Sequence, residues 1–114
     1  MHFDELPEFS RDVKVLFKKY KTLNDDLIVL KQVLEVFPNE RPPFSYRINN
    51  LALKSNVIKV KKIACKSLKG KGVNTGLRLI YAHIPEKQKI ILIEMYHKSD
   101  RRQEDRVSIL ANFK

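Results

Sequence analysis

The chain has 114 residues, 43% of them hydrophobic and 32% charged, and a mass of 13.4 kDa. This length and composition predict one globular domain, residues 1–114, and argue against a disordered chain. No apolar run approaches the roughly 18 residues of a membrane-spanning helix, and the first residues carry acids where a signal peptide carries bases. The single cysteine, Cys65, rules out an internal disulfide and a zinc site built from several cysteines. We therefore expect a cytoplasmic protein held together by hydrophobic packing.

Two helices are predicted in the first 40 residues. Apolar side chains in residues 9–20 recur at spacings of three and four, with lysines between them and Ser10 as the expected N-cap. A second apolar stripe covers residues 27–37 and ends before Pro38. We expect these helices to form an antiparallel hairpin whose apolar stripes belong to the core and not to a cofactor site.

The apolar spacing changes to two in the second half, where residues 57–63, 77–83 and 89–96 are predicted strands. Their short connections favour antiparallel pairing. Residues 2–6 are a candidate edge strand, Pro42-Pro43 predicts an extended connection, and the capping-box spacing of Asp100 and Gln103 predicts a short C-terminal helix. The predicted fold class is α+β: an N-terminal helical hairpin packed on an antiparallel sheet of three to four strands, followed by a short C-terminal helix.

The net charge of +10 is concentrated in one half of the chain. Residues 1–53 contain eight acids and eight bases, whereas residues 54–114 contain 15 bases and five acids. Residues 54–71 contain seven lysines and no acid. This asymmetry predicts a polyanionic partner, and charge alone fits RNA, DNA, an anionic membrane or an acidic protein. The lysines of this segment are Lys54, Lys59, Lys61, Lys62, Lys66, Lys69 and Lys71.

Alternate residues of a strand point to opposite faces of the sheet, so sequence position predicts two faces. The face expected under the helices contains Ile58, Val60, Leu77, Leu79, Tyr81, Ile91, Ile93 and Met95. The other face is expected to form an exposed cationic platform of Lys59, Lys61, Arg78, Glu94, Tyr96 and Lys98, with Ile80, Ala82 and Leu92 between them. Arg78 interrupts an otherwise apolar strand, and its forked guanidinium suits a pair of phosphate oxygens. Solvation of the lysines, and an ion pair between Glu94 and Arg78 or a lysine, remain open alternatives.

Two histidines require separate interpretations. His83 lies on the predicted core side near a turn, which indicates a packed side chain. His97 follows the third strand and is either structural or a proton donor turned towards the platform. No combination of His, Cys and carboxylate residues has the spacing of a metal site, so we expect neither a metal nor another cofactor.

The run VIKVKK, the glycine-rich loop after it and the segment GLRLIYAHIPEKQKIILIEMYHKSDR, preceded by two charged helices, resemble the RelE/ParE superfamily of toxins. These bacterial and archaeal proteins belong to type II toxin–antitoxin systems, and the resemblance to the RelE-like branch covers nearly the whole chain. It implies an mRNA interferase, a ribosome-dependent endoribonuclease that cuts messenger RNA without a metal. It also implies a small cognate antitoxin as partner, and the ribosome and mRNA as targets, with no membrane and no small-molecule cofactor.

The resemblance assigns Lys59 and Lys61 to the two family lysines before the loop, and Arg78 to the family arginine of the following strand. Lys98 stands where RelE itself has an arginine. Glu104 occupies about the place of the C-terminal tyrosine of RelE, which has no counterpart here. Other branches end in His-Tyr, whereas Tyr96 and His97 carry these residue types in reverse order.

The implied reaction is attack of the RNA 2′-hydroxyl on the adjacent phosphate. Arg78, Lys59 and Lys61 would stabilise the developing charge, a lysine or Glu94 would act as base, and His97 or Tyr96 would protonate the leaving oxygen. The same fold is compatible with a ParE-like toxin that poisons DNA gyrase, or with an inactive module that binds RNA or an antitoxin. The RNA contacts are expected from Lys54, Lys62, Lys66, Lys69, Lys71, Arg101 and Arg102.

Overall fold

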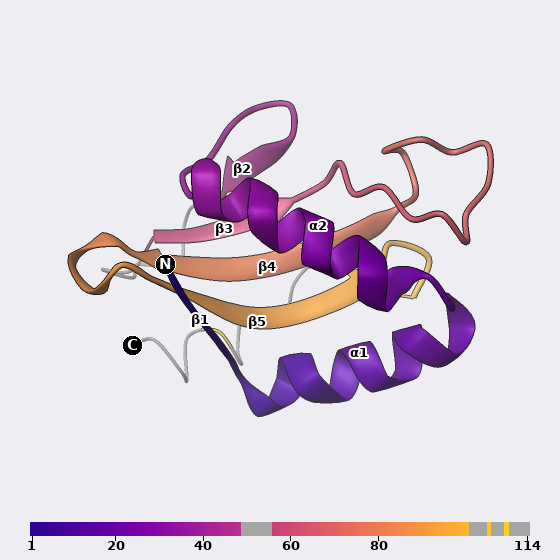
Figure 1. The fold of residues 1–114 in the computed structure, drawn as a ribbon, viewed down its shortest axis with the longest axis horizontal. Coiled ribbons are helices and arrows are strands. Elements are labelled where there is room, and N and C mark those ends of the chain that lie inside the picture. Colours follow the sequence, from indigo (N-terminus) through magenta and orange to yellow (C-terminus); the bar gives the residue numbers. More distant parts are fainter. Residues whose placement is uncertain (49–55, 101–104, 106–108, 110–114) are drawn as a thin grey trace.

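The structure is a computed structural model that describes residues 1–48, 56–100, 105 and 109. Two helices and five strands make up the described part of the chain (Figure 1). In chain order the elements are β1 (His2–Glu5), α1 (Pro7–Lys19), α2 (Leu23–Val36), β2 (Ser45–Arg47), β3 (Asn56–Val60), β4 (Leu77–Ile84), a 3₁₀ turn (Pro85–Lys87) and β5 (Lys89–His97).

Helix α1 begins at Pro7, three residues before the expected N-cap. Proline suits the first helical position because its φ is already helical and its missing N–H would have no partner there. The Ser10 side chain instead donates to the Glu5 carboxylate at 2.8 Å and to the Leu6 carbonyl at 3.4 Å, and Leu6 is the N-cap. The prediction of Ser10 as N-cap was therefore wrong.

Helix α2 ends as expected, with the Phe37 N–H bonded to the Val33 carbonyl. Its first turn is tied to a distant loop by two reciprocal hydrogen bonds. The Thr22 N–H donates to the Ser67 hydroxyl at 3.0 Å, and the Ser67 N–H donates to the Thr22 hydroxyl at 2.8 Å. This pairing fixes the lysine-bearing loop after β3 to the start of α2.

The five strands form one sheet in the order β1-β5-β4-β3-β2. The neighbours from β5 to β2 are antiparallel, whereas β1 runs parallel to β5 with His2 opposite Lys89. The α+β class and the edge strand near the N-terminus are confirmed. The sheet was predicted with three to four antiparallel strands, but the described sheet has five strands and is mixed. The prediction missed β2 because three residues are too short to show an alternating pattern. It missed the parallel pairing because the sequence of β1 does not indicate the direction in which the strand pairs.

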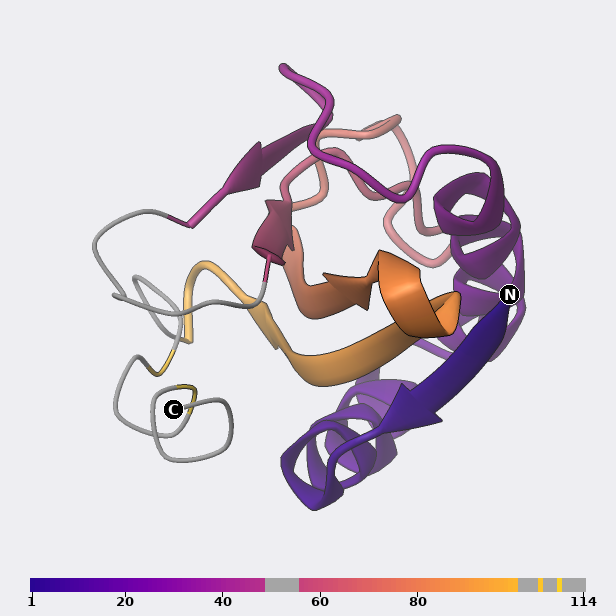
Figure 2. The same ribbon diagram turned by 90° about the vertical axis from the view of Figure 1, so that its left-hand side faces the viewer.

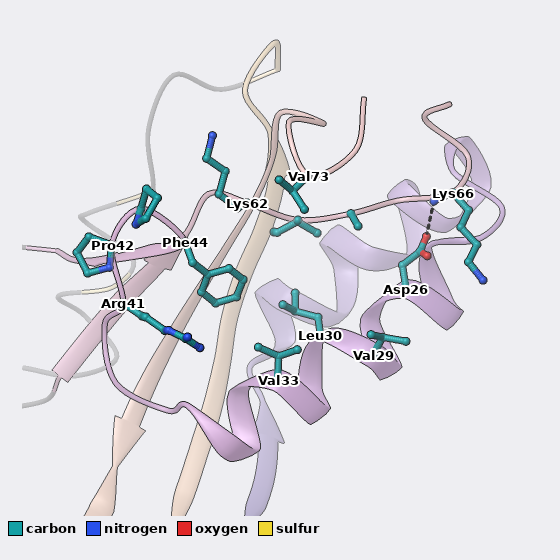
Figure 3. A pocket seen from close by; sticks show the side chains of 13 residues that line it. Asp26, Val29, Leu30, Val33, Arg41, Pro42, Phe44, Lys62, Lys66 and Val73 are labelled. Atoms are coloured by element: carbon teal, nitrogen blue, oxygen red, sulfur yellow. Dashed lines mark hydrogen bonds between the residues drawn. The ribbon is translucent and has the colours of Figure 1, made fainter. Parts of the chain in front are cut away.

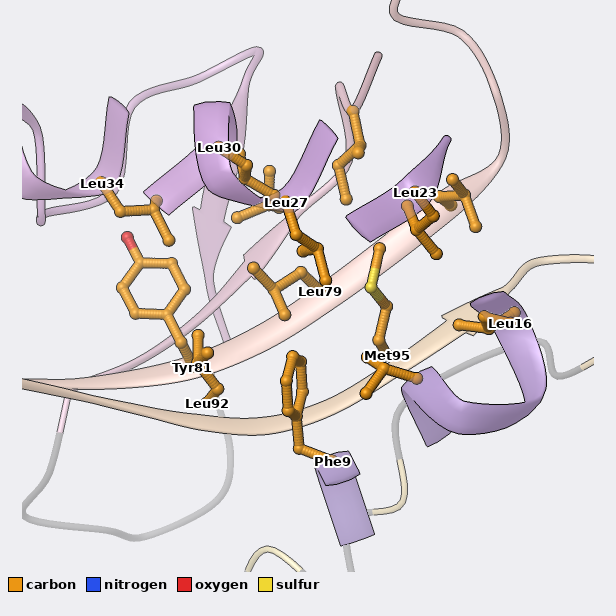
Figure 4. Packing of buried hydrophobic residues seen from close by; sticks show 14 of the residues in the cluster. Phe9, Leu16, Leu23, Leu27, Leu30, Leu34, Leu79, Tyr81, Leu92 and Met95 are labelled. Atoms are coloured by element: carbon orange, nitrogen blue, oxygen red, sulfur yellow. The ribbon is translucent and has the colours of Figure 1, made fainter. Parts of the chain in front are cut away.

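Both helices lie on one side of the sheet and run in opposite directions (Figures 1 and 2). Their buried side chains, among them Phe9, Leu16, Leu27 and Leu34, meet Leu79 from β4 and other strand residues in one apolar core (Figure 4). We call this side of the sheet the helix face. The predicted helical hairpin on one face of the sheet is confirmed.

One buried hydroxyl at the end of this core is satisfied. The Tyr81 side chain donates to the carbonyl of Pro38 at 2.7 Å, just beyond α2. Burial raises the pKa of Tyr81 well above its ordinary value, so the phenol stays protonated and remains a donor.

A β-bulge in β5 changes which of its residues face the helices. Ile80 pairs with Glu94 and Tyr81 with Leu92, so Ile93 is an extra residue on β5. Leu92 and Ile90 therefore lie under the helices, and Ile91 and Ile93 point to the opposite face. The predicted faces of Ile91, Ile93 and Leu92 were wrong because strict alternation does not survive an inserted residue.

We call the opposite side of the sheet the second face. It carries its own apolar cluster, and part of it is covered from solvent. Residues far from β4 and β5 in sequence cover it, namely Ile48 before the first undescribed segment and Ile109 near the C-terminus. Most of the predicted C-terminal helix lies outside the described residues. The buried cluster consists of Ile48, Val57, Ile80, Ala82, Ile93, Tyr96 and Ile109.

Within the described residues, neither helix has the length and apolar character required to cross a membrane.

Candidate functional site

The ends of three strands bring basic residues together at one edge of the sheet. Lys61 and Lys62 directly follow β3, Arg78 is the second residue of β4, and Lys98 directly follows β5. Because these strands are antiparallel neighbours, the end of β3, the start of β4 and the end of β5 meet at the same edge. Basic residues spread over 38 positions of sequence thus become neighbours.

These four basic side chains line a cleft of about 300 Å³, which we call the cationic cleft. Pro43, Tyr46, Asn74 and Gly76 complete its described lining. None of the described residues that line it is acidic. Four cations without a lining carboxylate repel one another, so the cleft is electrostatically suited to an anion with several oxygens.

Arg78 is half-buried and anchored in this cleft. Its Nη1 donates to the carbonyl of Lys61 at 3.1 Å and to the carbonyl of Leu77 at 3.2 Å. The guanidinium makes no ion pair with any residue of the described segments. One side of the fork is therefore held in place by backbone oxygens, and Nη2 and Nε are the donors that suit an oxyanion.

The two lysines after β3 are also positioned. The Lys61 ammonium lies 5.0 Å from the centre of the Tyr46 ring, which is a cation–π contact between the loop and β2. The Lys62 Nζ donates to the Asn74 side-chain oxygen at 2.7 Å. Backbone bonds from the N–H groups of Lys61 and Lys62 to the Phe44 carbonyl, at 3.0 and 3.4 Å, hold this turn against the segment before β2.

Three predicted platform residues do not line the cleft. Lys59 lies on the second face of β3, in register between Tyr46 of β2 and Ile80 of β4. Glu94 and Tyr96 lie on the same face of β5, and each is only 3% exposed. For Glu94 and Tyr96 the prediction of an exposed platform was wrong, because Ile48 and Ile109 cover this part of the sheet, whereas Lys59 is half-buried.

Backbone from the C-terminal segment reaches the Glu94 carboxylate. Oε1 of Glu94 accepts a hydrogen bond from the Asp105 N–H at 2.8 Å. The Glu94 carboxylate is therefore a buried, hydrogen-bonded group on the covered second face.

His97 turns towards the helix face and not towards the cationic cleft. Its ring stacks on Tyr20 with centroids 6.3 Å apart. Nε2 lies 2.8 Å from the Thr75 carbonyl oxygen, and Nδ1 accepts from the Ser99 N–H at 3.1 Å. Since a carbonyl can only accept, these contacts assign the proton of the neutral ring to Nε2. The ring also packs against Gly76, so it supports the turn that leads into Arg78.

The residues predicted to contact RNA are distributed around this edge. Lys62 lines the cationic cleft, whereas the side chains of Lys66, Lys69 and Lys71 are exposed on the loop between β3 and β4. The other three predicted contacts, Lys54, Arg101 and Arg102, lie outside the described residues.

Sequence reasoning missed two members of the cleft. Tyr46 is an exposed aromatic residue on β2, a strand too short to give a periodic signal. Asn74 lies in the loop before β4, where its only sequence signal is a polar residue near glycines. His83, by contrast, is packed as expected, with Nδ1 3.0 Å from the Asn39 side-chain oxygen. Burial lowers the pKa of His83, an effect that the charge of Glu86 opposes.

A metal-binding cluster is not found in the described part of the chain, where no three His, Cys, Asp or Glu side chains are grouped to hold an ion.

Comparison with models of known protein families found no match, and comparison with curated protein sequences found none. One similar solved structure is that of a metal-bound toxin from Helicobacter pylori. The two share 14% sequence identity with a TM-score of 0.61, and the alignment covers 89% of this chain and 98% of that one. At this identity the similarity concerns the fold: the chain has the same arrangement of helices and sheet as that toxin.

Proposed function

We propose that this chain is the toxin of a toxin–antitoxin pair and a RelE-like endoribonuclease that cuts messenger RNA on the ribosome. The observation that carries the proposal is the cationic cleft, with the anchored guanidinium of Arg78 at its side. The fold shared with a Helicobacter pylori toxin and the sequence resemblance to the RelE-like branch support it. The cognate partner is then a small antitoxin.

The cleft is suited to charge stabilisation. In the proposed reaction the RNA 2′-oxygen forms a bond to phosphorus while the bond to the 5′-oxygen breaks, which leaves a cyclic phosphate and a 5′-hydroxyl. The protein needs no nucleophile of its own. Arg78, Lys61 and Lys62 stabilise the extra negative charge of the pentacoordinate state, because they are already held in place before the substrate arrives.

Two protons must also move. Among the cleft residues, a lysine amine in its neutral form accepts the proton of the 2′-hydroxyl, and a protonated lysine supplies one to the leaving 5′-oxygen. Lys61 and Lys98 are our candidates because both line the cleft. Glu94 and Tyr96 are buried, and His97 is hydrogen-bonded to the Thr75 carbonyl, so none of the three lines the cleft. We assign these residues, together with Lys59, a supporting role around the cleft.

The remaining exposed lysines extend the positive surface. Lys66, Lys69 and Lys71 lie on the loop that leads to the cleft, and we propose that they contact phosphates of messenger or ribosomal RNA. We extend this role to Lys54, Arg101 and Arg102 from their sequence positions.

The test is induced expression followed by mapping of transcript ends. We expect the wild-type chain to produce new ends within translated regions, and Arg78→Ala to reduce their frequency roughly 100-fold or more, as for the loss of one preorganised charge stabiliser. Arg47→Ala is the matched control, because Arg47 is an exposed arginine of β2 that does not line the cleft. Cutting by Arg78→Ala at the wild-type frequency would overturn the assignment.

A second candidate is a binding toxin of the ParE-like kind, which poisons DNA gyrase, or an inactive binding module. The orientation of His97 towards the helix face favours this candidate, because the described lining of the cleft then contains no imidazole or carboxylate and offers only the lysines and the Tyr46 phenol for proton transfer. Cleaved DNA with intact messenger RNA after induction supports gyrase as the target. RNA binding without cutting supports the inactive module.

A further inference from the structure

The described lining of the cationic cleft includes an aromatic side chain, that of Tyr46 on the edge strand β2. Tyr46 is 39% exposed, and the Lys61 ammonium lies 5.0 Å from the centre of its ring on one side. Every nucleobase has a flat face that stacks on such a ring. The exposed ring therefore suits a base whose phosphate lies among the four cations of the cleft.

Asn74, on the loop before β4, is held by its main chain and by its side chain. Its N–H donates to the Lys71 carbonyl at 2.9 Å, and it forms an isolated bridge with Ile63. Its Oδ1 accepts a hydrogen bond from the Lys62 Nζ at 2.7 Å. Since an ammonium can only donate, this bond assigns the oxygen to the Lys62 side of the amide. Within the described segments Nδ2 donates to no protein atom, so it is the end of the amide that suits a ligand.

Lys62 is itself positioned for this contact by the turn after β3. It borders a groove of about 740 Å³ between α2 and residues 41–44 and 62–66. In this groove Phe44 points towards α2, whereas the Lys62 side chain points away from the helix (Figure 3). The ammonium therefore serves the cleft and not the groove, and it fixes the Asn74 amide before a ligand arrives.

The side chains of the described cleft lining offer many donors and few acceptors. Its four cations can only donate. The Asn74 oxygen is engaged by Lys62, and the Tyr46 hydroxyl is the side-chain group of this lining that still offers an acceptor. Such a surface pairs with carbonyl oxygens of a base and leaves an amino group poorly partnered, which costs binding free energy.

The four RNA bases differ in this respect. Guanine and uracil carry a carbonyl oxygen where adenine and cytosine carry an amino group. We propose that Tyr46 and Asn74 form a base site in the cationic cleft that prefers a keto base, guanine or uracil, next to the bound phosphate. The Tyr46 ring stacks on the base, and Asn74 Nδ2 donates to its carbonyl oxygen. This inference rests on the proposed function, because it takes the anion of the cleft to be an RNA phosphate.

The experiment is a titration of the full chain with nucleoside monophosphates, followed by NMR through the side-chain amide of Asn74. Inosine and adenosine 3′-monophosphates differ by a keto or an amino group on the same ring system, and uridine and cytidine 3′-monophosphates differ in the same way. We expect the keto member of each pair to bind about fivefold tighter or more. The 5′-monophosphates of the same nucleosides show on which side of the phosphate the base lies.

Two variants separate the roles of the amide and the ring. Asn74→Asp keeps an oxygen for Lys62 but removes the amide donor, so the preference for inosine over adenosine should disappear or reverse. Asn39→Asp is the matched control, because Asn39 is also exposed and does not line the cleft. Tyr46→Leu should weaken all four nucleotides about fivefold or more through lost stacking, with the ratio within each pair unchanged. Phe37→Leu is its control, since Phe37 is 44% exposed and lies outside the described cleft lining.

Equal binding of the inosine and adenosine nucleotides would overturn the keto preference, and so would a preference that survives Asn74→Asp. Affinities that Tyr46→Leu leaves unchanged would overturn stacking on this ring. The titration requires neither cutting nor a ribosome. A chain that shows the expected ratio but cuts no transcript would therefore refute the ribonuclease and keep the base site. Transcript ends without a bias towards guanine or uracil beside the cut would refute the base site and keep the ribonuclease.

Discussion

The two faces of the sheet are built from the same strands but have different contents. On the helix face, α1 and α2 cover an apolar layer, and Tyr81, His83 and His97 are ionisable strand residues on this side. On the second face, a smaller apolar cluster shares the surface with Lys59, Glu94 and, at the edge, Arg78. Burying charge is costly, so charged residues on this face require hydrogen-bond partners or contact with solvent.

The candidate site lies at the edge where the two faces begin to differ. Both faces are dry at the centre of β4, where Leu79 and Ile80 are each fully buried on opposite sides. The two faces differ in polarity at the start of β4, where the second face carries the half-buried Arg78 in place of a buried apolar side chain. A rigid sheet, buried on both faces, therefore fixes the position of the guanidinium.

The largest expected effect compares the two faces directly. Ile58 and Ile80 are both fully buried, Ile58 under the helices and Ile80 in the second-face cluster. We expect Ile58→Ala to lower the free energy of unfolding by about 3–5 kcal/mol and Ile80→Ala by about 2–3 kcal/mol, because a smaller cluster can relax further around a cavity. Urea denaturation of both variants measures this difference. A cost for Ile80→Ala below about 0.5 kcal/mol would contradict a dry second face.

The next effect concerns the turn before β4, at the edge of the sheet that forms the cationic cleft. Gly76 has φ +85°, and a Cβ there would lie 2.7 Å from His97 Nε2. We expect Gly76→Ala to lower the free energy of unfolding by about 2–3 kcal/mol, from the left-handed conformation and the displaced imidazole together.

Gly70→Ala is the matched control for this turn. Gly70 also has a positive φ, of +76°, but a Cβ there would meet no atom within 4 Å. Its cost should be about 1 kcal/mol, from conformation alone. Equal costs for the two variants, measured by thermal or urea denaturation, would mean that contact with His97 does not constrain the turn.

A smaller effect tests the charge of the second-face edge. We expect Lys62→Ala to reduce the slope of log affinity against log salt for single-stranded RNA by about 0.7, the value for one lost phosphate contact. Lys87→Ala should leave the slope unchanged, because Lys87 is exposed in the turn at the far end of β4. Filter binding at a series of salt concentrations provides the measurement, and an unchanged slope for Lys62→Ala would exclude this lysine from the proposed RNA contacts.

The smallest effect lies on the helix face and depends on pH. Because burial lowers the pKa of His83 in the folded chain, the folded state favours the neutral ring. The corresponding stability is fully present above the unfolded pKa of about 6.5 and is lost as the pH falls from there towards the lower folded value. Between pH 7 and pH 5 the wild-type chain should therefore lose more stability than His83→Gln. Parallel pH profiles of the two chains by denaturation would disprove this role.

The sequence predicted the parts of the molecule that follow from local periodicity. The stripes of α1 and α2 and the alternation in β3 and β4 are such signals, and Arg78 was conspicuous because it broke one. The inserted residue Ile93 was invisible, since a bulge is decided by the pairing of β5 with β4 and not by β5 itself.

The candidate site was predictable only in part for a related reason. Lys61, Arg78 and Lys98 were identified by charge and position, and the structure brings them to one cleft. The burial of Glu94 and Tyr96 depends on Ile48 and Ile109, which are distant in sequence and reach the second face only through the tertiary fold. Tyr46 required knowledge of which strand pairs with β3.

The parallel pairing of β1 with β5 has a consequence for synthesis. Residues 2–5 leave the ribosome before their partner strand, residues 89–97, which comes more than 80 residues later and sits between β1 and β4. Contacts of such separation form late, because much chain must be ordered before they contribute. A nascent chain halted before residue 89 lacks the strand that supports α1, so it cannot complete this core. Such an unfinished chain would also lack the end of β5 that supplies one side of the cationic cleft.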